Sequence, residues 1–181
     1  MTAPVLPDAA LTARLSPLRL MVFDVDGVLT DGQLIYSDGG VESKTFSTRD
    51  GQGIRLLRDA GIKLAIITAR RSDAVDRRSR DLGMHFCFQG VEAKLGAFME
   101  MLDELKLTPG QAGYMGDDFL DAPVLASAGF AATVPAAPPE IKQRCHYVAR
   151  QPGGAGAARE VCELILRAQG SYDRIVAGYL K

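Results

Sequence analysis

The chain has 181 residues, of which 47% are hydrophobic and 24% charged, a composition typical of an ordinary globular protein with room for one α/β domain. Its formal net charge of -1 does not favour binding to nucleic acid. The sequence has no apolar stretch near the roughly 18 residues of a membrane-spanning helix. Its three cysteines are widely spaced, which fits free thiols in a reducing compartment. We therefore expect a cytoplasmic protein without nucleic-acid or membrane partners.

Residues 1–17 carry three prolines and lack the basic and apolar regions of a signal peptide. We expect a loosely ordered N-terminal extension there, and a single domain over residues 18–181.

Short apolar runs alternate with amphipathic segments along the rest of the chain. Strands are predicted at 18–23, 63–68, 86–88, 111–115, 130–134 and 147–148. Helices are predicted at 50–60, 72–82, 93–105, 121–128 and 158–168. Residues 33–46 predict a β-hairpin around a Gly-rich turn, and residues 151–181 form a C-terminal tail that begins with a Gly-rich loop. This alternation predicts an α/β fold, a Rossmann-like parallel sheet with helices on both faces.

One predicted helix, 93–105, has a regular apolar stripe. The residues that we expect to be buried along it are Leu95, Phe98, Met99, Leu102 and Leu105.

Asp24 and Asp26 follow the first predicted strand directly, separated by a single valine. Side chains two residues apart share one side of an extended chain, and α/β proteins bind ligands beyond the carboxyl ends of their strands. Two close carboxylates repel each other unless a cation or a proton lies between them. The pair therefore suits a Mg²⁺-assisted reaction in which one carboxylate attacks and the other transfers protons.

Three further positions at strand ends or helix starts carry polar groups that suit the same Mg²⁺-assisted chemistry. Thr68 ends the second strand, Lys94 opens the helix after the third, and the fourth strand ends in residues 116–121, GDDFLD. A hydroxyl and an ammonium can neutralise a transferring phosphoryl group, while the carboxylates can hold Mg²⁺. These positions together predict a phosphoryl-transfer site.

The order of these motifs resembles that of the haloacid dehalogenase (HAD) superfamily of phosphatases. Over residues 18–169 the chain is similar to its 3-deoxy-D-manno-octulosonate 8-phosphate phosphatase family. The strings that carry this closer resemblance are FDVDGVLTDG (23–32), KTFSTRDGQGIRLL (44–57), IITARRS (66–72), QG (89–90), GDDFLDAPVL (116–125) and GGAGAAREVCELILRAQG (153–170). The resemblance implies a capless HAD-like domain with a hairpin after the first strand, which assembles as a homotetramer and acts in lipopolysaccharide precursor synthesis.

The resemblance also implies roles for individual residues. Asp24 is the nucleophile and a Mg²⁺ ligand, and Asp26 is the acid and base whose backbone carbonyl binds the metal. Asp117 is the third protein ligand, with Asp118 and Asp121 in support, while Thr68 and Lys94 hold the phosphoryl oxygens. The positions implied to contact the sugar acid, some of them from a neighbouring subunit, are Ser47, Thr48, Arg49, Asp50, Gly51, Arg55, Arg70 and Arg78, together with Asp26 and Lys94.

Alternatives remain open at this point. The chain departs from the family pattern at Ser47, 134–139 and Ala155, so a nine-carbon sialic-type acid 9-phosphate is a second candidate substrate. A catalytically idle oligomeric domain is another possibility, although both Asp24 and Asp26 are present. A phosphomutase normally needs a cap domain, and no insertion of that size lies between Asp26 and Thr68.

Overall fold

A computed structural model describes residues 5–181 of the chain, so residues 1–4 lie outside the described part. Its centre is a six-stranded sheet in which all neighbouring strands are parallel. The strands are β1 (Leu20–Phe23), β4 (Lys63–Thr68), β5 (Phe86–Gln89), β6 (Ala112–Met115), β7 (Phe130–Thr133) and β8 (Tyr147–Val148). Their order across the sheet is β5-β4-β1-β6-β7-β8, which places β1 near the middle.

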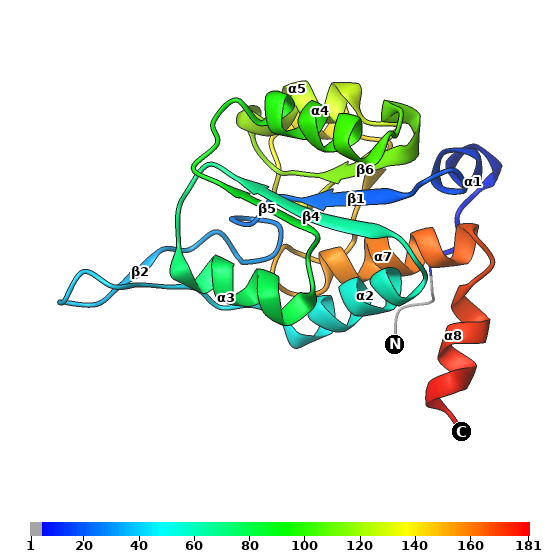
Figure 1. Ribbon diagram of the computed structural model, residues 1–181, viewed down its shortest axis with the longest axis horizontal. Helices are drawn as coiled ribbons and strands as arrows, with labels where there is room; N and C mark the ends of the chain where they lie inside the picture. Colours follow the sequence, from blue (N-terminus) through cyan, green and yellow to red (C-terminus); the bar gives the residue numbers. More distant parts are fainter. Residues whose placement is uncertain (1–4) are drawn as a thin grey trace.

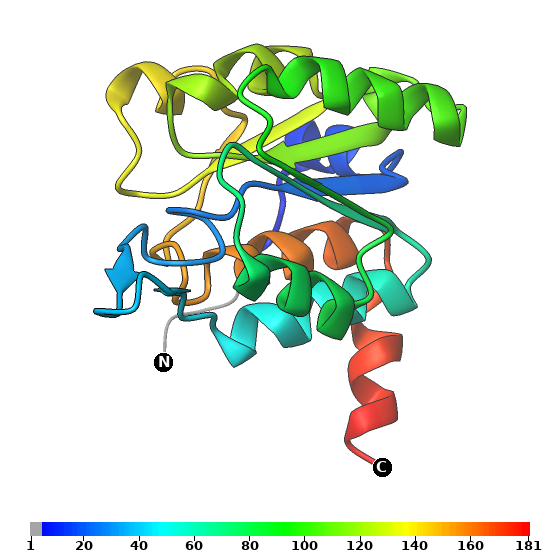
Figure 2. The same cartoon turned by 60° about the vertical axis from the view of Figure 1, so that its left-hand side comes forward.

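Helices cover both faces of the sheet, as predicted (Figure 1). One face carries α2 (Thr48–Asp59), α3 (Asp73–Leu82) and α7 (Ala157–Ala168), and the other carries α4 (Lys94–Leu105) and α5 (Ala122–Ser127). Two 3₁₀ turns lie at Pro109–Gln111 and Phe119–Asp121, and a short helix, α6, at Pro139–Lys142. The last helix, α8 (Tyr172–Tyr179), extends away from the body of the molecule (Figure 2). None of the helices in residues 5–181 is long and apolar enough to cross a membrane.

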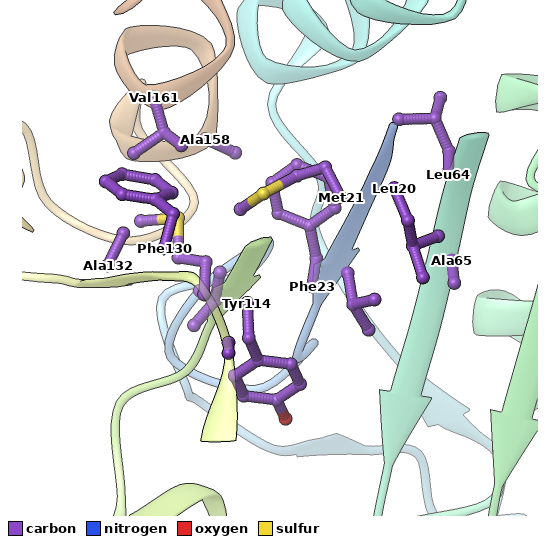
Figure 3. Packing of buried hydrophobic residues seen from close by; sticks show 14 of the residues in the cluster. Leu20, Met21, Phe23, Leu64, Ala65, Tyr114, Phe130, Ala132, Ala158 and Val161 are labelled. Carbon is purple, nitrogen blue, oxygen red and sulfur yellow. The ribbon is translucent and has the colours of Figure 1, made fainter. Parts of the chain in front are cut away.

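The core lies between the sheet and its two helical layers. Every side chain of β1 is fully buried, as expected of a central parallel strand covered on both faces. On the α7 side, Phe130 packs with Ala158 and Val161 (Figure 3). On the opposite side, the ring of Tyr114 meets Phe98 of α4 edge to face. Truncating one of these buried aromatic side chains to alanine is expected to cost about 3–5 kcal/mol.

The hairpin follows β1 and projects from one side of the molecule (Figure 1). Its two strands, β2 (Ile35–Tyr36) and β3 (Glu42–Ser43), are shorter than the segment predicted from the sequence. Among its exposed residues are four large apolar or aromatic side chains: Leu34, Ile35, Tyr36 and Val41. A two-stranded ribbon of this length is marginal alone, so other contacts must hold it.

The structure differs from the expectation of a loosely ordered segment over residues 1–17. Within the described part, α1 (Ala9–Leu15) is a helix that Asp8 caps by accepting a hydrogen bond from the Leu11 amide. Leu15 and Leu18 are fully buried, which ties this helix to the core. The apolar spacing gave no signal, because Leu15 is the one fully buried residue of so short a helix, while Leu11 is only partly buried against the core.

The buried stripe of α4 also differs from the prediction. Met99 is 40% exposed, whereas Ala97 and Met101 are buried beside Phe98 and Leu102. Lys94, at the first position of the helix, is itself buried and shares a face with Phe98 and Met101 at spacings of four and seven residues. The buried face of the helix therefore runs through Lys94, Ala97, Phe98, Met101 and Leu102.

Candidate active site

The carboxyl ends of β4, β1 and β6 meet the start of α4 around one cleft. Parallel strands end at the same edge of a sheet, so segments far apart in the sequence come together there. The cleft is lined by Asp24, Asp26, Thr68, Ala69, Arg70, Lys94, Asp117, Asp118, Leu120 and Asp121. It contains every residue to which the sequence analysis gave a part in phosphoryl transfer or metal binding.

Asp24 is a buried carboxylate of the cleft, with 7% of the residue exposed. Its Oδ1 accepts a hydrogen bond of 2.7 Å from the Val25 amide, and its Oδ2 lies 2.9 Å from Nζ of Lys94. Burial, reinforced by the nearby charge of Asp121, raises the pKa of Asp24 to about 7, although Lys94 opposes the shift. The fold thus holds a carboxylate that needs additional positive charge in order to ionise fully.

Lys94 and Asp121 form the buried floor of the cleft. Burial by itself would lower the pKa of Lys94, but Asp24 and Asp121 together raise it, which keeps the ammonium charged. Asp121 is fully buried, and its Oδ1 accepts hydrogen bonds from Nζ of Lys94 at 2.7 Å and from the Tyr114 hydroxyl at 2.6 Å. Its Oδ2 accepts the amides of Asp117 and Asp118. With both oxygens occupied, Asp121 is suited to orient its neighbours.

Asp117 completes the carboxylate cluster. Its Oδ1 is buried and has no hydrogen-bond partner among residues 5–181. Burial, followed by the charges of Asp24 and Asp121, raises the pKa of Asp117 to about 7. Gly27 approaches this carboxylate so closely that a Cβ at its position, where φ is +87°, would lie 2.0 Å from Oδ2 of Asp117. Glycine is therefore required at the first turn after Asp26.

These carboxylates can hold a cation. One oxygen each from Asp24, Asp117 and Asp121 lie within 4.8 Å of one another. The unpartnered oxygen of Asp117 and the raised pKa values of Asp24 and Asp117 indicate a site that lacks positive charge. An all-oxygen donor set of this kind suits Mg²⁺. The sequence predicted the side chains of Asp24 and Asp117 and the backbone carbonyl of Asp26 as ligands. The side-chain cluster contains Asp24 and Asp117 together with Asp121, and the part of the Asp26 carbonyl stays a prediction.

Thr68 and Arg70, two more of the predicted phosphate- and substrate-binding residues, line the same cleft. Thr68 is buried at the end of β4, and Arg70 lies two residues beyond it. The guanidinium of Arg70 donates hydrogen bonds to the Tyr36 hydroxyl at 2.8 Å and to Oε2 of Glu42 at 2.6 Å. The pKa of Glu42 is lowered, and the largest cause is the hydrogen bond that its carboxylate accepts from Arg70. Arg70 therefore joins the hairpin to the cleft.

Lys44 is a residue of the site that the sequence analysis did not single out. It follows β3, and its ammonium forms an ion pair with Oδ1 of Asp26 while its side chain is 1% exposed. No motif spacing signals this contact, because it depends on how the hairpin folds back over the sheet edge. The base of the hairpin thus contributes a cation to the cleft.

The other predicted substrate contacts lie away from the cleft, around the start of α2. Ser47 caps this helix through its Oγ, which accepts the amide of Asp50, and Arg78 donates to the Ser47 carbonyl at 2.9 Å. Asp50 is buried and accepts the amides of Gly156 and Arg159, so it joins α2 to α7. Within one subunit these groups are occupied in holding the fold together.

The remaining members of that group have similar surroundings. A Cβ at Gly51 would lie 2.3 Å from the guanidinium of Arg78, so this glycine allows the arginine to approach α2. Arg55 donates to the Asp81 carbonyl at 3.2 Å, while Thr48 and Arg49 are exposed at the beginning of α2. Their assignment as substrate contacts stays a prediction.

The Gly-rich start of the C-terminal tail packs against the loop that follows Asp26. The amide of Gly154 donates to the Val28 carbonyl at 2.9 Å. A Cβ at Gly153 would lie 1.8 Å from the Gly27 carbonyl oxygen, and one at Gly154, where φ is +65°, would meet the backbone of Thr30. These two glycines allow the backbone of the tail to pack closely against the loop and support it.

Comparison with known proteins gives the following relatives. The chain is 45% identical over 156 residues to the 3-deoxy-D-manno-octulosonate 8-phosphate phosphatase KdsC of Yersinia pestis, an alignment that covers 86% of this chain and 83% of the relative. It superimposes with a TM-score of 0.92 on a Moraxella catarrhalis 3-deoxy-D-manno-octulosonate 8-phosphate phosphatase solved with magnesium, phosphate and KDO. That pair is 40% identical and covers 93% of this chain and 97% of the other.

A third relative extends the comparison to the superfamily. A Legionella pneumophila structure described as a HAD-superfamily hydrolase matches with a TM-score of 0.90 and 36% identity, covering 94% of this chain and 93% of that one. No family model matches the chain.

Proposed function

Because the chain belongs to the 3-deoxy-D-manno-octulosonate 8-phosphate phosphatase family of the HAD superfamily, we propose that it is a Mg²⁺-dependent phosphatase. Its substrate is 3-deoxy-D-manno-octulosonate 8-phosphate, which it hydrolyses to the free sugar acid, KDO, and phosphate in the supply of lipopolysaccharide precursors. A relative at 40% identity has been solved with magnesium, phosphate and KDO, and this supports the same substrate here.

The observation that carries the proposal is the buried cluster formed by Asp24, Lys94, Asp117 and Asp121 at the strand ends. Mg²⁺ bound there supplies charge that neutralises the carboxylates and the phosphoryl oxygens. Asp24, Asp117 and the backbone carbonyl of Asp26 are the proposed protein ligands. Asp121, whose oxygens already accept four hydrogen bonds, orients the amides of Asp117 and Asp118 and the ammonium of Lys94.

The reaction divides between two carboxylates. Asp24 attacks phosphorus through a carboxylate oxygen and forms an aspartyl-phosphate, while Asp26 protonates the departing sugar oxygen and later accepts a proton from the attacking water. Thr68 and Lys94 bind the phosphoryl oxygens and stabilise their charge. The buried position of Lys94, held between Asp24 and Asp121, supports this role.

Recognition of the sugar acid falls to residues outside this cluster. Arg70 lines the cleft with its side chain 42% exposed, so its guanidinium can reach a carboxylate of the substrate. Arg78, Arg55 and positions 47–51 are proposed to contribute from a neighbouring subunit of a homotetramer. The exposed apolar hairpin supports assembly, because its side chains need a partner surface. We place the working enzyme in the cytoplasm, with residues 18–181 as its catalytic domain.

A substrate panel tests this proposal. Phosphate release is measured with Mg²⁺ on the eight-carbon keto-acid 8-phosphate, a nine-carbon sialic-type acid 9-phosphate and common hexose phosphates. We expect the highest kcat/KM on the eight-carbon compound and no turnover by Asp24→Asn. A preference for the nine-carbon acid would replace the proposed substrate, and no Mg²⁺-dependent release from any phosphate ester would favour an idle domain.

A further inference from the structure

Lys44 lies at the cleft although no motif assigns it a role. It follows β3 at the base of the hairpin, and its side chain is enclosed between two carboxylates. Its ammonium pairs with Oδ1 of Asp26 and lies 3.3 Å from Oε1 of Glu42. A buried ammonium is costly unless it is paired, so these two carboxylates fix its position.

The two oxygens of Asp26 have different surroundings. Oδ1 accepts the hydrogen bond from Lys44, whereas Oδ2 is buried and accepts none from the part of the chain that the structure describes. Nε of Arg70 lies 3.9 Å from Oδ2, beyond hydrogen-bonding distance. A carboxylate with one oxygen anchored has one oxygen left with which to exchange a proton.

We propose that Lys44 is a positioning residue, which anchors Oδ1 of Asp26 so that Oδ2 gives the proton to the leaving oxygen. The inference rests on the proposed function, in which Asp26 is the general acid. Glu42 extends the anchor, because it contacts Lys44 through one oxygen and Arg70 through the other. The base of the hairpin therefore sets the geometry of proton transfer, independently of any contact that its tip makes.

Two aryl esters of similar size separate this role from others. Phenyl phosphate has a more basic leaving group than 4-nitrophenyl phosphate, so its cleavage depends more on the proton donor. We expect Lys44→Met to lower kcat/KM about 10- to 100-fold on phenyl phosphate and about threefold or less on the nitrophenyl ester. Lys44→Arg keeps the positive charge and should recover part of the loss. The control is Lys63→Met, an exposed lysine at the start of β4, which should change neither rate.

Each outcome decides between the hypotheses. Equal losses on both esters, or none, in a Lys44→Met protein with native circular dichroism would overturn the role of Lys44. If that variant does not fold, Lys44→Gln, which keeps a neutral donor and most of the length, is compared in the same way. Asp26→Asn isolates the premise: if it shows no larger loss on phenyl phosphate, the acid role of Asp26 and the Lys44 inference both fail. If it shows the difference and the Lys44 variants do not, only the Lys44 inference fails.

Discussion

The cleft at the strand ends and the surface around the start of α2 were both predicted to bind the substrate, but their polar side chains have different surroundings in the structure. In the cleft, Asp24, Lys94 and Asp117 point into one space and leave an unpartnered carboxylate oxygen within the described chain. Around α2, Asp50 and Arg78 have their polar groups bound to the backbone of the same subunit. The groups predicted for the chemistry thus meet within the described part of one chain, whereas the predicted contacts to the sugar acid around α2 are not among the residues that line the cleft.

The largest effect is expected at the nucleophile. Asp24→Asn should lower kcat by about 10⁴-fold or more, because the attacking carboxylate oxygen is lost without a change of volume. The variant should stay folded, since it removes a buried charge. Steady-state kinetics with Mg²⁺ and thermal unfolding measure the two effects. Wild-type-like turnover would remove the cleft from the chemistry.

Removing the metal should stop turnover as completely, but reversibly. We expect EDTA to abolish phosphate release while far-UV circular dichroism remains native, because the fold is held by the apolar core and Mg²⁺ contacts few protein atoms. Ca²⁺ should not restore the rate, since its larger and less regular coordination shell fits in-line transfer poorly. A protein that melts on chelation would have a structural metal instead.

The raised pKa values of Asp24 and Asp117, both about 7, predict how stability depends on pH in the absence of metal. Between their ordinary value near 4 and pH 7 the folded state binds more protons than the unfolded chain. The free energy of unfolding of the metal-free protein should therefore fall, by on the order of a few kcal/mol, as the pH rises from 4 to 7.

Urea unfolding at several pH values in EDTA measures this dependence. Added Mg²⁺ should stabilise the protein most at pH 8, where both carboxylates are ionised. Asp24→Asn should weaken the pH dependence. A free energy of unfolding that rises over the same range would contradict the raised pKa values of these carboxylates.

A smaller effect is expected at Arg70, the arginine within the cleft. Arg70→Ala should lower kcat/KM on the sugar-acid phosphate by about 10- to 100-fold, mainly through KM, because a guanidinium–carboxylate contact is lost. Activity on an aryl phosphate without a carboxylate should change much less. Comparable losses on both substrates would mean that Arg70 acts on the hairpin or on Asp26 and not on the sugar acid.

The smallest effect is expected at Arg78. Its guanidinium donates to the Ser47 carbonyl and lies over the Phe46 ring, so Arg78→Ala should cost about 1–2 kcal/mol of stability. Denaturant unfolding measures this loss. The same variant tests the predicted recognition role: a KM that rises for the sugar-acid phosphate but not for an aryl phosphate would support Arg78 as a substrate contact.

The position of the cleft could be predicted from the sequence because each motif directly follows a segment that reads as a strand. Asp24, Thr68 and Asp117 each follow an apolar run, and a parallel sheet brings such positions together whatever the loops do. Lys44 was missed because its contact with Asp26 depends on the course of a hairpin with no regular pattern. Met99 was assigned to the core because its spacing fits a stripe, whereas the buried face of α4 runs through Lys94, Ala97, Phe98 and Met101.

Other features of the fold could not be predicted from the sequence for similar reasons. The helix α1 was not predicted because its short length and the prolines on either side of it suggested irregular chain, and the burial of Leu15 and Leu18 is a tertiary effect. The region around α2 was assigned to the substrate by resemblance. Its hydrogen bonds to α7, through Asp50, join residues more than a hundred positions apart, which no local pattern reveals.

The contact between the Gly-rich tail and the loop after Asp26 has a consequence for how the enzyme is made. Asp24 leaves the ribosome well before Gly153 and Gly154, which support the loop beside it. A growing polypeptide should therefore acquire phosphatase activity only after residues 153 and 154 have been made and have packed against that loop. Shorter products would carry the whole motif around Asp24 and yet remain inert.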